Sequence, residues 1–218
     1  MAIALVITVF VGFGPTYYLR SVFDSRQLTP SLYVHGFAFT TWMVLLVVQT
    51  SLIAANRTAV HRRLGVAGGA LGVLMMVLGA YVAITRFRAG LMVAPVGLPV
   101  GVLLAVALAT IVVFPVLLGS ALWFRGRPDV HKRLVLLATF ELATAAVARW
   151  PVVAPLGPIA FFGVTDLFVV ALAVYDWRTQ RRIHPATLWG GLFLIASQPL
   201  RLVIGFTSAW QAFGAWLT

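Results

Sequence analysis

Three of the four histidines stand in matching settings, each directly before a long apolar run. His61 is followed by two arginines in the stretch AVHRRLG, His131 by a lysine and an arginine in DVHKRLV, and His184 by a proline. A helix N-terminus presents unpaired N–H groups and a partial positive charge. Both disfavour protonation of a histidine and favour the neutral imidazole, the form that binds metals and haem iron.

These histidines allow two interpretations. In the first, His61 and His131 face each other and bind one haem iron or divalent metal, with His184 as a third ligand. In the second, each His-cation-Arg element caps a helix at headgroup depth and binds lipid phosphates. No apolar run contains two histidines, so at most one haem with two histidine ligands can form.

A second polar set lies inside the apolar runs, where ionisable residues are costly and each suggests a functional site. With a rise of about 1.5 Å per residue, four residues from different runs fall at overlapping depths near the other membrane face: His35, Arg149, Asp166 and Arg201. Gln198 lies one turn from Arg201, and Glu141 lies nearer the middle of its run. An arginine without a close partner suits a small anionic ligand. The alternative is a structural ion-pair network that binds nothing.

The composition is that of a membrane protein. Of 218 residues, 61% are hydrophobic and 10% charged, against about 45–50% and about 25% in soluble domains. The net charge of +11 would suggest nucleic acid in a soluble chain. Here the cations lie between apolar runs, so we expect contact with the bilayer and its anionic headgroups and no nucleic-acid partner. The absence of cysteine excludes iron–sulfur clusters and thiolate metal sites.

Long apolar runs predict an all-α integral membrane protein, a single domain over 1–218 with about seven transmembrane helices. The expected spans are 2–19, 31–54, 64–85, 98–124, 134–153, 158–176 and 187–206. The matching histidine stretches indicate a weak repeat that relates the second and third spans to the fourth and fifth. The first run has no cationic start and no clear cleavage site, so we expect a retained helix. A last amphipathic piece with Trp210 and Trp216 suits the membrane interface.

The connections between the runs carry unequal charge. The second, fourth and sixth connections hold ten cations: Arg57, Arg62, Arg63, Arg125, Arg127, Lys132, Arg133, Arg178, Arg181 and Arg182. The first and third hold four, Arg20, Arg26, Arg86 and Arg88, and the fifth holds none. Because cytoplasmic loops are enriched in Lys and Arg, this predicts an N-in, C-out orientation with the three histidines near the inner face.

The residues of the repeat also carry a resemblance. The stretches YVHGFAFTTWMVLLVVQTSLIAANRTAVHRRLG (33–65), PDVHKRLVLLATFELATAAVARWP (128–151) and IHPATLWGGLFLIASQPLRL (183–202) resemble an uncharacterised family of multi-spanning bacterial membrane proteins. Their His-Arg/Lys-Arg-Leu motifs are distantly similar to those of predicted membrane proteins of the haem or oxidase-maturation type. The resemblance covers most of the chain from residue 15 onward. It implies a bacterial cytoplasmic membrane and, by analogy, haem or metal handling.

Two functional hypotheses follow. The first is a redox or maturation role that uses a b-type haem or a divalent metal held by the inner-face histidines. The second is binding or transport of a small anionic or amphipathic ligand through the outer-half set of His35, Arg149, Asp166 and Arg201. Candidate partners are a second copy of the chain or a respiratory complex. No hydrolase, Walker or zinc-protease motif is present, so no enzyme class is indicated.

Overall fold

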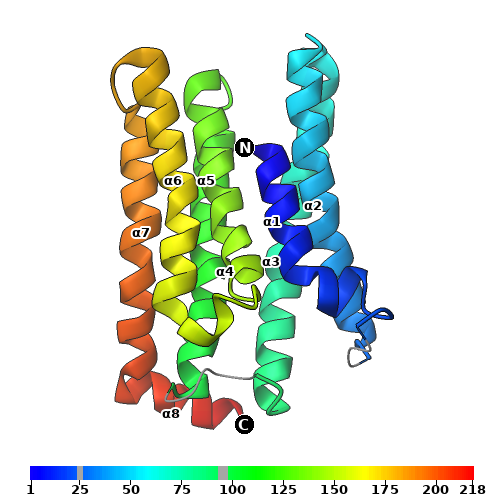
Figure 1. Ribbon diagram of the computed structural model, residues 1–218, viewed down its shortest axis with the longest axis vertical. Coiled ribbons are helices and arrows are strands. Elements are labelled where there is room, and N and C mark those ends of the chain that lie inside the picture. Colours follow the sequence, from blue (N-terminus) through cyan, green and yellow to red (C-terminus); the bar gives the residue numbers. More distant parts are fainter. Residues whose placement is uncertain (24–26, 93–97) are drawn as a thin grey trace.

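The computed structural model describes residues 1–23, 27–92 and 98–218, and these residues form helices and turns with no strand (Figure 1). The helices are α1 (Ala2–Phe13), which continues as a π-helix (Gly14–Tyr18), α2 (Pro30–Ala54), α3 (Thr58–Arg88), α4 (Val100–Trp123), α5 (Pro128–Val147), α6 (Pro158–Gln180), α7 (Pro185–Phe206) and α8 (Ser208–Leu217). A short 3-10 turn (Ala154–Leu156) precedes α6. The all-α prediction is confirmed.

Five of the described helices are long and apolar enough to cross a membrane: α2, α3, α4, α6 and α7. The chain is therefore a multi-pass membrane protein. The segment Ala2–Tyr18 is also apolar but shorter. Helix α5 differs because its 20 residues include two acidic and two basic side chains, Asp129, Lys132, Arg133 and Glu141.

Two helices begin six residues earlier than the apolar runs predict. The run expected at 134–153 is helical over Pro128–Val147, and the run expected at 64–85 is helical over Thr58–Arg88. Pro128 occupies the first turn of α5, where its fixed φ favours a helix start and no N–H is needed. Hydropathy finds where the apolar part of each helix begins, and it misses the charged first turn that precedes this part. His61 and His131 consequently lie inside the first turns of α3 and α5.

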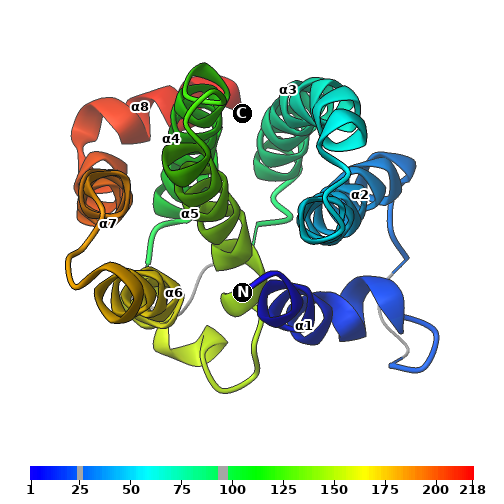
Figure 2. The same cartoon turned by 90° about the horizontal axis from the view of Figure 1, so that it is seen from above.

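Helix α5 is the centre of the bundle. It packs against α1, α4, α6 and α7, and its residues 137–144 are all buried, so every face of this segment is covered. The view down the bundle shows α5 beside α4, with α6, α7 and α1 around it (Figure 2). Because the helix is enclosed by protein, its charged side chains must find partners among the helices that surround it.

The connections α2–α3, α4–α5 and α6–α7 lie together at one end of the bundle, which we call the arginine-rich end (Figure 1). The N-terminal turns of α3, α5 and α7 are at this end, as expected for the three histidines. Helix α8 crosses the opposite end, where the Trp210 indole N–H donates to the carbonyl of Gly101 at 2.8 Å. Arg26, one of the cations counted in the connections, falls outside the described residues.

Glycines allow close helix packing at two seams. On α3, Gly68 and Gly72 face α2 and α4, and a Cβ added at Gly72 would lie 2.6 Å from a Leu118 methyl group. On α1, a Cβ at Gly12 would overlap the carbonyl oxygen of Ala146 on α5. Backbone cannot yield as a flexible side chain can, so the α1–α5 seam tolerates no side chain at Gly12.

Gly12→Ala is expected to separate α1 from α5 and to destabilise the fold by about 1–3 kcal/mol, the usual cost of overpacking. Gly79→Ala is the matched control, because nothing lies within 4 Å of its added Cβ. That variant should be neutral or slightly stabilising, since alanine favours a helix by up to about 1 kcal/mol over glycine. Thermal unfolding in detergent measures both, and equal midpoints would show that the α1–α5 contact is loose.

Candidate functional site

His61 and His131 converge at the arginine-rich end. Each lies in the first turn of its helix, where its backbone N–H donates to Arg57 O or Arg127 O, respectively. Their ring centroids are 6.3 Å apart and their planes are nearly perpendicular, at 85°. The fold thus brings together two imidazoles that are 70 residues apart in the sequence, as the first interpretation requires.

Hydrogen bonding fixes the tautomer of His131. Its Nδ1 lies 2.8 Å from the carbonyl oxygen of Ala121 on α4. A carbonyl only accepts, so Nδ1 carries the hydrogen, and in the neutral ring Nε2 keeps its lone pair. Histidines that bind metals almost always donate their other ring N–H in this way, often to a backbone carbonyl. The Ala121 carbonyl therefore selects the tautomer of the neutral His131 ring that can bind a metal through Nε2.

Two polar atoms at this site are buried without a hydrogen-bond partner in the described chain. They are Nδ1 of His61, a member of the pair, and Oε1 of the neighbouring Gln49. The Gln49 amide lies against the same turn, because its Nε2 donates to the carbonyl of His61 at 3.3 Å. Buried polar groups are normally satisfied, and each exception calls for an explanation. This corner of the bundle therefore favours an additional polar or coordinating group.

The centroid distance matches that of two imidazoles that bind one ion from opposite sides. With metal–nitrogen bonds of about 2.0–2.1 Å, two such imidazoles have ring centres roughly 6 Å apart. Among the described residues, no third His, Asp or Glu joins them to form a three-ligand group. A structural zinc site takes four protein ligands. Haem iron takes only axial ligands from the protein, so two histidines suit haem better than a bare divalent ion.

His184, the expected third ligand, serves a different purpose. It is the N-cap of α7, and its Nδ1 accepts the backbone N–H of Ala186 at 3.1 Å. Burial lowers the pKa of His184, and the nearby Arg133 charge lowers it further, so the ring is neutral at pH 7 and can accept this bond. The structure does not bring His184 into one ligand set with His61 and His131.

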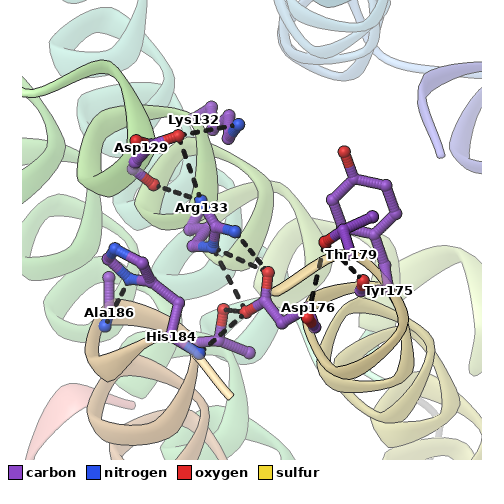
Figure 3. A network of polar contacts seen from close by, with 9 residues as sticks. Asp129, Lys132, Arg133, Tyr175, Asp176, Thr179, His184 and Ala186 are labelled. Atoms are coloured by element: carbon purple, nitrogen blue, oxygen red, sulfur yellow. Dashed lines mark hydrogen bonds and ion pairs between the residues drawn. The ribbon is translucent and has the colours of Figure 1, made fainter. Parts of the chain in front are cut away.

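A buried ion pair lies near His184 and joins α5, α6 and α7 (Figure 3). The Arg133 guanidinium donates through Nε and Nη2 to the carboxylate of Asp176 and through Nη1 to the carbonyl of Asp129. Asp176 also accepts the hydroxyl of Thr187 and, at 3.2 Å, the backbone N–H of His184. Arg133 is 1% exposed and Asp176 is fully buried. Every strong donor and acceptor is satisfied, so this network locks three helices together.

The sequence contained a signal for this network. Asp176 closes the predicted 158–176 run, and an acidic residue inside a span is normally paired. Because the sequence places Arg133 among the cations of the fourth connection, it predicts only a topological role for this residue. Its helix in fact begins at Pro128, so Arg133 lies one turn inside and its side chain points to protein.

The outer-half set divides into two groups. In the first, Arg201 pairs with Glu141 (Nη1 to Oε1, 2.8 Å), and Thr110 donates to the same carboxylate at 2.7 Å. Arg201 also donates to the Ser197 hydroxyl at 2.6 Å, and its guanidinium lies 5.3 Å from the Phe162 ring centroid. Arg201 is 2% exposed and fully partnered. It therefore has no free guanidinium for an incoming anion.

The remaining members follow a different pattern from the one expected. Asp166 accepts a hydrogen bond from Gln198 at 2.7 Å and makes no described ion pair with an arginine. Arg149 donates to the carbonyl of Ala145 and lies 4.5 Å from the Phe13 ring centroid, toward α1. His35 packs on Phe39 on α2 at 4.3 Å, and its Nδ1 is buried without a described partner.

Comparison with protein-family models, with curated proteins and with solved structures found no match. The resemblance carried by the His-Arg/Lys-Arg-Leu motifs therefore stays a prediction. Functional proposals for this chain therefore rest on the geometry of its residues and on that predicted resemblance.

Asp176→Asn is expected to destabilise the bundle by about 3–5 kcal/mol, because it leaves the Arg133 charge buried and unpaired. The double variant Arg133→Met, Asp176→Leu should recover much of that loss, since no charge is left to compensate. Lys132→Gln is the control: Lys132 is exposed, its ion pair is with the exposed Asp129 at 3.0 Å, and its loss should change the unfolding midpoint little. A double variant less stable than the single one would contradict this account.

Proposed function

We propose that the chain spans the bacterial cytoplasmic membrane seven times, with the N-terminus inside and the C-terminus outside. Five long apolar helices support this proposal. Helix α5, which packs against three of them, and the apolar segment Ala2–Tyr18 bring the number of spans to seven. The gathering of the even-numbered connections at the arginine-rich end supports the orientation, because cytoplasmic loops are enriched in Lys and Arg.

We further propose that His61 and His131 bind one haem iron, or failing that a divalent metal, in a redox or oxidase-maturation role. The observation that carries this proposal is the convergence of two imidazoles at 6.3 Å, one of them fixed by Ala121 with its Nε2 lone pair available. The haem would supply one-electron chemistry. The chain would supply the two ligands, the rigid first helical turns that hold them, and the cations Arg62 and Lys132 for an anionic group.

The second hypothesis, a pocket for a small anionic ligand, has less support from the geometry. Arg201 is neutralised by Glu141, and His35 and Arg149 lie in different surroundings from Asp166. The contacts of Glu141 and Arg201 are those of a structural network that joins α5 to α7. The anionic-ligand pocket stays a prediction, and no observation favours it over the histidine pair.

The absorption spectrum of the purified protein tests the histidine site. Protein expressed with haem supply should show a Soret band, and His61→Ala or His131→Ala should reduce haem per protein at least tenfold, because each removes an axial ligand. His184→Asn is the matched control, since asparagine also caps a helix and the ring is not a ligand. Folded wild-type protein with neither a Soret band nor stoichiometric metal would overturn the proposal.

Labelling of single cysteines tests the orientation, because the natural chain contains no cysteine. Gly126→Cys, in the α4–α5 connection, should react with a membrane-impermeant maleimide only after the cells are opened. Thr218→Cys, after α8, should react in intact cells. Both positions are exposed in the structure, so lack of access would report the membrane and not burial. The reverse pattern would require an inverted topology.

A further inference from the structure

A groove of about 510 Å³ opens on the side of the bundle near the arginine-rich end. Its walls are α4 and α7, which contribute Leu117 and Ser120, and Trp189 and Phe193, respectively. Val130 and Leu134 of α5 form the floor between them. The volume falls within the range of about 300–1,000 Å³ that is usual for small-molecule sites.

The groove lies between α4 and α7 only at the end of these helices near the arginine-rich end of the bundle. At the other end the two helices approach so closely that a Cβ added at Gly205 would lie 2.9 Å from the Cα of Val102. Toward the arginine-rich end, α5 fills the floor between them and the groove forms above it. Its position is therefore set by the helix packing and does not depend on a loop.

The length and surface of the groove suit a lipid chain. From Val116 to Phe124 it extends about 12 Å at 1.5 Å per residue, close to the roughly 15 Å of hydrocarbon in one leaflet. Its wall faces outward, since Trp189 is 68% and Val116 47% exposed. Apart from Ser120, the side chains between the two ends are apolar.

The end of the groove at headgroup depth is polar and offers two hydrogen-bond donors. Arg127 lines this end, with its guanidinium 5.8 Å from the Phe124 ring centroid. His184 lines it too, and because its Nδ1 accepts the Ala186 N–H, its neutral ring carries the hydrogen on Nε2. A guanidinium and an N–H donor together suit a phosphodiester.

The local charge balance favours an anion. The nearest carboxylates are already engaged, Asp129 by Lys132 at 3.0 Å and Asp176 by Arg133 in the buried network. The surrounding connections add further cations without acidic residues, including Arg125, Arg181 and Arg182. A second copy of the chain seated on this face would bring the same positive charges together, which disfavours a protein occupant.

We propose that this groove is a binding site for an anionic phospholipid of the same leaflet. One acyl chain would lie along α5 between α4 and α7, and Arg127 and His184 would hold the phosphodiester. The site is separate from the His61–His131 pair and does not depend on any ligand bound there.

Native mass spectrometry of the detergent-purified protein tests this site, with dioleoyl phosphatidylglycerol and dioleoyl phosphatidylcholine as probes. We expect one tightly retained phosphatidylglycerol, bound at least fivefold more strongly than phosphatidylcholine. Arg127→Gln should weaken phosphatidylglycerol binding by roughly fivefold, the factor typical of one surface cation, and should leave phosphatidylcholine unchanged. Ser120→Phe, which fills the groove without a charge change, should weaken both lipids.

Arg125→Gln is the matched control, because it removes an exposed cation from the same connection without touching the groove. It should retain the wild-type preference. Equal binding of the two lipids, or a preference that survives Arg127→Gln, would overturn the proposal. A stable dimer that excludes phosphatidylglycerol would overturn it as well, by making a second copy the occupant. If Ser120→Phe does not fold, the comparison of Arg127→Gln with Arg125→Gln decides.

Discussion

The central constraint on this fold is that its most enclosed helix is also charged. Helix α5 carries Arg133 and Glu141 at almost full burial, where an unpaired charge in a membrane costs at least about 2.5–3.5 kcal/mol. Each therefore has an opposite charge on a later helix, Asp176 on α6 and Arg201 on α7. These two pairs fix the depth and rotation of three helices relative to one another. Apolar packing alone specifies this arrangement only weakly, because the lipid chains around the helices are as apolar as their side chains.

The histidine pair depends on the same central helix. His131 lies two residues before Arg133 in the first turn of α5, so the buried ion pair that anchors this turn also limits the movement of the imidazole. Ala121 holds the ring from α4, and His61 approaches from α3. A ligand at this point would thus be held by elements whose positions are already determined by charge pairing. Such support is what a coordination site requires of its scaffold.

The sequence predicts much of this fold and little of its side-chain pairing. Apolar runs predict every long helix because hydropathy and helix length both reflect the bilayer. The start of α5 is missed because a charged first turn, stabilised by Pro128, is invisible to hydropathy. Depth along each helix places Asp166, Gln198 and Arg201 at overlapping levels but sets Glu141 nearer the middle of its run, although Glu141 is the residue that pairs with Arg201. Depth does not give the rotation of each helix, so the partner of Arg201 could not be assigned in advance. The same limit applies to His184, whose ring turns back to cap its own helix.

The order of the paired residues along the chain has a consequence for biosynthesis. Arg133 precedes Asp176 by 43 residues, and Glu141 precedes Arg201 by 60. During N- to C-terminal synthesis, α5 therefore leaves the ribosome before either of its counter-charges exists. A helix with unpaired charges enters the bilayer poorly by itself. We therefore expect α6 and α7 to stabilise α5 in the membrane after α5 has been made. A nascent chain that ends before α7 contains Glu141 without its counter-charge Arg201, and its central helix is not stable in the bilayer.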